Sequence, residues 1–160
     1  MAVRIVVSAV AATALVALAA GCGGGGKKAV GTTTTTAAPA TPAEQKAQIK
    51  GVWERFFAGS TPASEKEVLL EHGSLLAPAI EAQAKSPLAK SSSAKVTNVT
   101  LNGPAKATVT YTILLGGKPA LQHQKGTAVK SGDSWKVGLA SFCRLLGLQG
   151  PAPKACSGAA

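Results

Sequence analysis

The sequence contains few of the side chains that carry out enzyme chemistry. Its 160 residues include one aspartate, two histidines and three cysteines. Asp133 lies in a Ser-Gly-Asp-Ser segment, where we expect its carboxylate to bond the backbone of a tight turn. His72 lies at a predicted helix end and His123 among polar residues, so we interpret both as surface histidines. Isolated histidines and such widely spaced cysteines match no zinc motif. We therefore predict a protein that is not an enzyme and that has no catalytic residue, metal site or cofactor.

Aromatic and acidic side chains are also scarce. Aromatic residues make up 4% of the chain, and 17 Lys and Arg face 7 Asp and Glu, for a formal net charge of +10. From Lys85 onward the lysines are spread singly along the chain, whereas nucleic-acid binding favours a basic stripe with interleaved aromatics. The composition therefore argues against a nucleic-acid partner. A cationic surface of this kind favours association with anionic envelope polymers and lipid head groups.

Long hydrophobic runs are absent except at the N-terminus. Arg4 precedes the uncharged run 5–20, a layout typical of a secretory signal. The following segment, Leu18-Ala19-Ala20-Gly21-Cys22, resembles the lipobox of bacterial lipoproteins, in which a peptidase cleaves before the cysteine and its sulfur receives a diacylglycerol. We therefore predict a signal peptide at 1–21, a lipidated Cys22 with palmitate-type acyl chains, and a location on the outer face of the cell membrane.

Two other interpretations of this N-terminus remain open. An ordinary secretory signal cut near residue 19 would release the protein, and the apolar run is close to the length of a membrane span. The cysteine count favours lipidation, because it leaves Cys143 and Cys156 as a pair in an oxidising compartment. We predict a disulfide between them. Closing a loop of about 14 residues contributes roughly 3 kcal/mol on the chain-entropy estimate.

A change in composition near residue 41 separates a linker from a folded domain. Residues 23–41 combine glycines, a threonine run and prolines with almost no bulky apolar side chain. Such a segment is typical of a flexible linker and spans roughly 25 Å on average. We therefore place the lipidated cysteine and linker at 22–41 and the domain at 42–160.

Three helices are predicted at the start of the domain. Thr41-Pro42-Ala43-Glu44 has the spacing of a capping box with proline at the first helical position. An apolar stripe follows and stops at Gly59; its members are Ile49, Val52, Trp53, Phe56 and Phe57. We expect a second helix from Thr61-Pro62 to Gly73 and a third over 75–85.

Beyond residue 87 the apolar period changes from near four to two, which predicts strands. We expect strands over 95–101, 105–115, 122–130 and 134–139, joined by short turns rich in glycine. Helices followed by an antiparallel meander indicate an α+β fold, with the helices packed on one face of a curved sheet of about four strands.

Several segments of the folded domain resemble those of a known family. The successive segments VWERFFAGSTP, AKVTNVTL, ATVTYTILLGG, GTAVKSGDSWKV and SFCRLL, with a late Cys156, are similar to the C-terminal domain of the mycobacterial low-molecular-weight secreted antigens. The resemblance covers roughly 43–160. It implies an actinobacterial exported or lipid-anchored protein with a cone-shaped, cystatin-like or nuclear-transport-factor-two-like domain, and it carries over no enzymatic activity.

Cone-shaped folds sometimes enclose a hydrophobic cavity between helix and sheet. The large aromatic side chains are therefore candidate cavity-lining residues, namely Trp53, Phe56, Phe57 and Trp135. We predict a non-enzymatic, lipid-anchored envelope protein whose domain binds a small apolar ligand or another protein. The alternative is a lipid carrier or an enzyme that uses the cavity of the cone.

Overall fold

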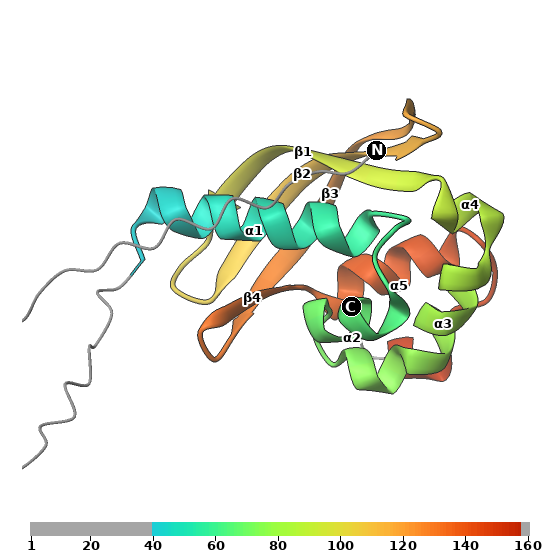
Figure 1. The fold of residues 1–160 in the computed structure, drawn as a ribbon. Helices are drawn as coiled ribbons and strands as arrows, with labels where there is room; N and C mark the ends of the chain where they lie inside the picture. The colour runs from blue at the N-terminus through green and yellow to red at the C-terminus, as the bar shows by residue number, and fades with distance from the viewer. Residues whose placement is uncertain (1–39, 158–160) are drawn as a thin grey trace, which may run out of the picture. The chain divides into compact units, whose positions relative to one another are not determined.

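The computed structural model describes residues 40–157, which form helices followed by a curved, four-stranded antiparallel sheet (Figure 1). The α+β arrangement predicted from the sequence is thereby confirmed. The predicted signal peptide, Cys22 and most of the predicted linker lie outside the described residues. Within residues 40–157, no helix combines the length and apolar character needed to cross a membrane.

The elements follow one another in a simple order. The helices are α1 (Pro42–Phe57), α2 (Ala63–Leu69), α3 (Ala77–Lys85), α4 (Pro87–Lys90) and α5 (Leu139–Gly147), with short 3₁₀ helices η1 (Gly73–Leu76) and η2 (Lys154–Cys156). The strands are β1 (Ser92–Leu101), β2 (Lys106–Leu115), β3 (Lys118–Ser131) and β4 (Ser134–Val137). Each strand pairs with the next. In Figure 1, α1 crosses one face of the sheet, and the other helices lie around the C-terminal end of α1.

Helix α1 begins and ends where the sequence predicts. The Glu44 amide donates to Thr41 Oγ1 at 3.3 Å, and the Thr41 amide donates to Glu44 Oε2 at 2.7 Å, which completes the capping box. The bond from the Thr41 amide, together with one from Thr41 Oγ1 to the same carboxylate oxygen at 2.8 Å, lowers the pKa of the Glu44 carboxyl. The helix ends just before Gly59, whose amide donates to Ser92 O at 2.9 Å. A Cβ at Gly59 would lie 2.1 Å from Lys90 O, so only glycine permits this approach.

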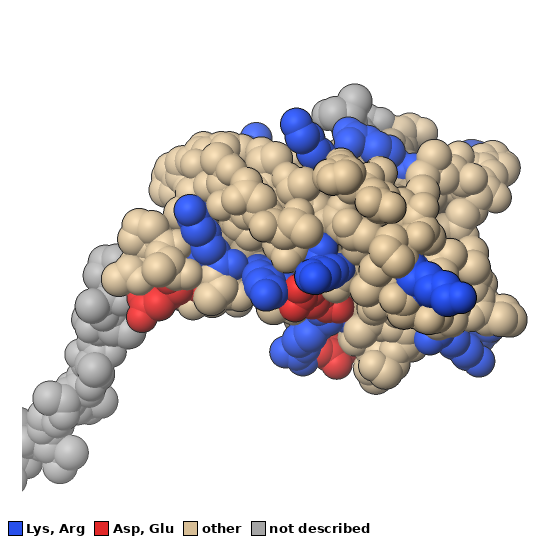
Figure 2. Space-filling model, turned by 90° about the horizontal axis from the view of Figure 1, so that it is seen from above, with Lys and Arg blue, Asp and Glu red and all other residues tan. Residues whose placement is uncertain are grey.

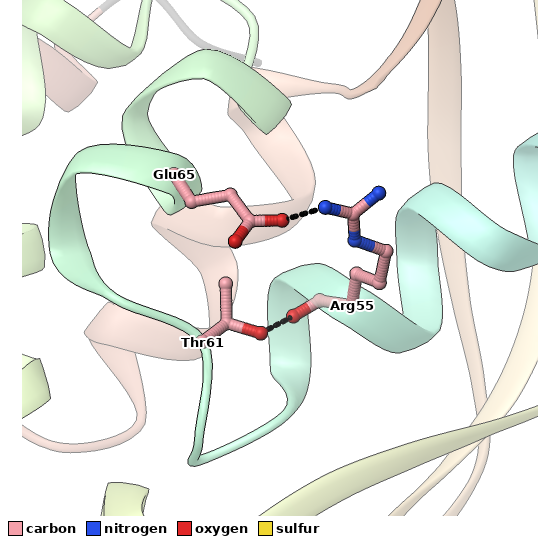
Figure 3. A network of polar contacts seen from close by, with 3 residues as sticks. All are labelled: Arg55, Thr61 and Glu65. Atoms are coloured by element: carbon pink, nitrogen blue, oxygen red, sulfur yellow. Dashed lines mark hydrogen bonds and ion pairs between the residues drawn. The ribbon is translucent and has the colours of Figure 1, made fainter. Parts of the chain in front are cut away.

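Helix α2 is shorter than predicted. An ion pair between Arg55 and Glu65 and a 2.6 Å hydrogen bond from Thr61 Oγ1 to Arg55 O join it to α1 (Figure 3). The helix stops at Leu69 because the next residue leaves it to form a parallel bridge with Val137 of β4. This tertiary pairing replaces the continuous helix that we expected up to Gly73.

The sheet has one buried face and one exposed face, as the period of two predicts. Ala107, Val109, Tyr111 and Ile113 of β2 are buried, and the residues between them are only partly buried. Strand β1 carries a bulge between Val96 and Asn98, where the Val96 amide donates to Glu54 Oε1 at 3.1 Å. Strand β3 begins at Lys118, four residues earlier than predicted. The turn before it is only Gly116-Gly117, both with positive φ.

The core is built around aromatic side chains from three elements. The Trp53 and Tyr111 ring centroids are 5.3 Å apart, those of Phe57 and Tyr111 are 5.6 Å apart, and those of Phe56 and Phe142 are 5.3 Å apart. These separations lie in the range in which aromatic pairs attract beyond their burial. The cluster therefore joins α1 to β2 and α5.

Helix α5 was not predicted from the sequence. Its N-cap, Gly138, has no side chain to cap the helix, and the Leu139 amide instead donates to Glu71 Oε2 at 2.9 Å. Ser141 Oγ accepts from the Thr127 amide of β3 at 2.8 Å. A disulfide joins Cys143 of α5 to Cys156 of η2, the pairing that the cysteine count predicts.

Candidate functional site

A depression of about 190 Å³ lies beside the C-terminal end of α1, and we call it the apolar pocket. Thirteen of its seventeen lining residues are apolar. They come from α1 (Phe56, Phe57), α3 (Ile80), α4 (Leu88, Ala89), β2 (Ile113, Leu115), β3 (Ala120, Leu121), α5 (Phe142, Leu145, Leu146) and the residue after it (Leu148). Helices α1, α3, α4 and α5 and the residue after α5 thus surround one end of β2 and β3.

Two of the four residues that we named as cavity-lining candidates lie in this pocket. Phe56 and Phe57 line it, whereas Trp53 and Trp135 do not. Trp53 is fully buried and packs on the sheet at Gly126, where a Cβ would come within 2.6 Å of the indole ring. Trp135 belongs to β4 and is buried. The prediction for these two tryptophans is therefore corrected: they are core residues, and neither indole N–H has a partner among the described residues.

The rim of the apolar pocket exposes large apolar side chains to solvent. Leu88 is 51% exposed, Leu121 is 36% exposed and Leu148 is 65% exposed. Single exposed leucines are ordinary, but three that line one apolar depression place exposed apolar surface beside it, which water solvates poorly. The pocket and its rim can therefore bind an apolar group.

Three of the four polar lining residues bond to other groups of the protein. Ser92 Oγ donates to Ala89 O at 2.7 Å and lies 3.1 Å from Phe57 O. Gln83 Nε2 donates to Gln149 Oε1 at 3.0 Å, across the side where α3 meets the segment after α5. Each of these three side chains therefore has at least one hydrogen-bond partner within the protein.

The fourth polar lining residue, Lys66, is different. It comes from α2 and is the only ionisable residue in the lining, which contains no carboxylate. Within residues 40–157 its ammonium group forms no ion pair, since the one pair found there joins Arg55 to Glu65. Burial lowers the pKa of Lys66.

The C-terminal segment forms one wall of the pocket. Leu148 and Gln149 follow α5 directly, and the disulfide from Cys156 to Cys143 holds this segment against that helix. The bond between Gln83 and Gln149 fixes it on the other side. The wall therefore depends on cross-links between segments that are distant in sequence.

A second, wider depression of about 500 Å³ lies between α2, the turn after it, and β3 and β4. Its lining contains two carboxylates, from Glu67 and Glu71, and two ammonium groups, from Lys130 and Lys136. Glu71 is already engaged by the Leu139 amide. Because its charges balance, this depression favours no ligand of one sign.

The two histidines and the aspartate that we interpreted as surface or turn residues lie in three separate segments. His72 lies in the turn after α2 with φ of 51°, His123 lies on β3 with φ of 53°, and both are exposed. Asp133 is exposed in the two-residue turn between β3 and β4, next to Gly132 with φ of 59°. The described residues contain no group of His, Cys, Asp or Glu suited to holding a metal ion.

Several lining residues were not found from the sequence. The contributions of α5 depend on a helix whose cap comes from Glu71, 68 positions away. Lys66 resembles every other exposed lysine in the sequence, and only the fold places it beside the apolar side chains. The apolar spacing of Leu139, Phe142 and Leu146 was the one available local signal for α5.

Comparisons with known proteins agree with the resemblance noted from the sequence. The family model described as low molecular weight antigen MTB12, C-terminal domain, matches residues 40–153. The search of curated proteins found no match. The matched segment runs from the cap of α1 to the residue before η2 and includes every lining residue of the apolar pocket. The chain therefore belongs to the family of the low molecular weight antigen MTB12 C-terminal domain.

Proposed function

We propose that this protein is a lipid-anchored protein of the cell envelope, with no enzymatic activity, whose domain binds an apolar chain of an envelope lipid in the apolar pocket. Membership of an antigen family supports an envelope or extracellular location. The lipobox-like segment ending at Cys22 supports the anchor. The single observation that carries the binding role is an apolar pocket rimmed by three exposed leucines.

The size of the pocket limits what it holds. Pockets for complete drug-sized molecules begin at about 300 Å³, and this one measures about 190 Å³. A single hydrocarbon chain fits such a volume better than a whole two-chain lipid. The exposed rim then covers the part of the chain that extends out of the pocket.

The charge of the domain suits an anionic envelope. Residues 86–157 contain nine Lys and Arg and one acidic residue, Asp133. Figure 2 shows the basic side chains distributed over the face seen from above rather than gathered in a single patch. Such a distribution supports general attraction to anionic polymers and lipid heads more than recognition of one polyanion.

The binding role is tested by titrating the exported full-length chain with decanol, an uncharged single-chain probe, in a calorimeter. Ala120 lines the pocket and is itself exposed, so Ala120→Trp fills the pocket without disturbing the core. Gln122→Trp is the matched control, because Gln122 is exposed on the same strand and does not line the pocket. We expect decanol binding in the wild-type chain and in Gln122→Trp, and loss of binding in Ala120→Trp.

A protein partner is the second candidate, because the rim leucines also suit an apolar side chain from another protein. In that case decanol does not bind the isolated protein with measurable affinity. The proposal of lipid-chain binding fails on that result, and it also fails if Ala120→Trp binds decanol as the wild type does.

A further inference from the structure

Resting on the binding function proposed above, we propose that the ligand of the apolar pocket is a fatty-acid-type amphiphile, whose carboxylate pairs with the Lys66 ammonium while its chain occupies the apolar part. The inference narrows the ligand from any apolar chain to one with an anionic head. Two observations support it: Lys66 lines the apolar pocket, and it forms no ion pair among the described residues.

The lining of the apolar pocket is almost entirely uncharged. Lys66 is the single charged residue among thirteen apolar and three uncharged polar side chains. A cation beside an apolar surface attracts an anion more strongly than a cation in bulk water, because the local dielectric constant is lower. An amphiphile with a carboxylate head satisfies the cation and the apolar surface together.

Lys66 has no carboxylate partner among the described residues. Nearby carboxylates are engaged elsewhere: Glu65 pairs with Arg55, and Glu71 accepts from the Leu139 amide. Glu67 lines the second depression instead. A half-buried ammonium without a carboxylate partner is costly, and its lowered pKa reports that cost. A bound carboxylate offsets the cost by supplying the missing charge.

The test compares decanoate with decanol at neutral pH, using the exported full-length chain and its variants. The two probes share one chain length and differ in the head group. We expect Lys66→Met to weaken decanoate binding about tenfold or more, the usual effect of losing a hydrogen bond to a charged group, and to leave decanol binding nearly unchanged. Lys46→Met is the matched control, because Lys46 is exposed on α1 and does not line the pocket.

A second readout measures the wild-type pocket directly. The ¹³Cε resonance of Lys66 is titrated with pH in the free chain and in the decanoate and decanol complexes. We expect the pKa of Lys66 to rise with decanoate, because the carboxylate favours the charged ammonium, and not to rise with decanol. Loss of the resonance in Lys66→Arg assigns it.

The outcomes separate this inference from the function on which it rests. If both probes bind the pocket equally well in wild type and Lys66→Met, and the pKa of Lys66 does not rise with decanoate, the anionic head is wrong and chain binding stands. If neither probe binds, or filling the pocket by Ala120→Trp has no effect, the binding function itself is wrong. Equal effects of Lys66→Met and Lys46→Met on decanoate also overturn the inference, because they indicate general charge attraction only.

Discussion

Gly126 determines how closely α1 approaches the sheet. A Cβ at this position would lie 2.6 Å from Trp53 Cζ2 and 2.9 Å from Ser141 Oγ, both of them buried groups. Trp53 in turn contacts Tyr111, so the glycine supports the aromatic core from the β3 side. The sequence offered no sign of this role, because a glycine within a strand predicts only a weak point or a bulge.

We predict that Gly126→Ala destabilises the domain by about 1–3 kcal/mol, the usual cost of overpacking a buried site. Gly51→Ala is the matched control, since Gly51 is exposed on α1 and an added Cβ meets nothing within 4 Å. That control should stabilise the helix by roughly 0.5–1 kcal/mol. Urea denaturation of both variants measures the difference, and a Gly126→Ala variant as stable as Gly51→Ala would show that Trp53 does not pack on this strand as described.

Tyr111 makes stability dependent on alkaline pH. Burial raises the pKa of Tyr111 to about 12 from 10.0, partly opposed by the charge of Arg144. The folded state therefore keeps the phenol proton where the unfolded state loses it, so stability falls as pH rises from about 10 to about 12. The loss amounts to about 2–3 kcal/mol from this residue.

Tyr111→Phe removes the titrating group and keeps the ring. We expect the free energy of unfolding of the wild type to fall relative to that of Tyr111→Phe between pH 10 and 12. Denaturant melts at several pH values give this difference. A constant difference across the range would mean that the phenol is hydrated in the folded state.

The candidate site shows how far residue types alone predict function. Phe56 and Phe57 were predicted to line a cavity because they are large aromatic residues in a chain that resembles cone-shaped folds, and both line the apolar pocket. Trp53 belongs to the same apolar stripe of α1, and only the position of Gly126 decides that it packs in the core instead. Lys66 and the residues of α5 could not be predicted, because their surroundings come from distant parts of the chain.

At the scale of elements, local signals account for the parts that were predicted well. The capping box fixed the start of α1, and strict alternation fixed β2. The errors occur where tertiary contacts replace local ones: α2 stops early because Leu70 pairs with β4, and α5 begins at a glycine whose cap is Glu71. Helix α4 forms at Pro87, where no helix was predicted.

The disulfide is the element-scale feature most directly tied to the pocket. It holds the segment that carries Leu148 against α5, so its loss frees one wall. We predict that Cys143→Ser with Cys156→Ser lowers the free energy of unfolding by roughly 3 kcal/mol and weakens decanol binding. Urea melts and decanol titration check the two effects.

Gln83→Leu provides the comparison for the disulfide variant, because it removes the hydrogen bond to Gln149, makes one lining side chain apolar, and leaves the covalent link in place. We expect a smaller loss of stability and of decanol affinity from this change, of the order of one hydrogen bond. Decanol affinity that is unaffected by either variant would contradict the role of this segment as a wall.

At the scale of the whole molecule, we propose that a lipid anchor at Cys22 attaches the binding domain to the membrane. We predict that Cys22→Ser abolishes membrane retention, because the acyl chains on that sulfur are the expected attachment. Detergent-phase partitioning of cell fractions measures retention. Partitioning that is unchanged by the substitution would favour a plain secretory signal or a retained membrane span.

The charge asymmetry also acts at this scale. The segment 40–85 carries six of the seven acidic residues, while the later part of the domain is strongly cationic. An anchored domain with this asymmetry is attracted to an anionic surface mainly through its sheet half, and salt weakens the attraction. Such attraction raises the local concentration of anionic lipids near the pocket without specifying one.

Native mass spectrometry of the protein purified from its own envelope tests the central claim most directly. The account predicts a non-covalent adduct with the mass of a single-chain lipid on the wild-type protein, and loss of that adduct in Ala120→Trp but not in Gln122→Trp. A spectrum showing only the covalently modified chain in all three proteins, or an adduct that persists after the pocket is filled, would contradict it.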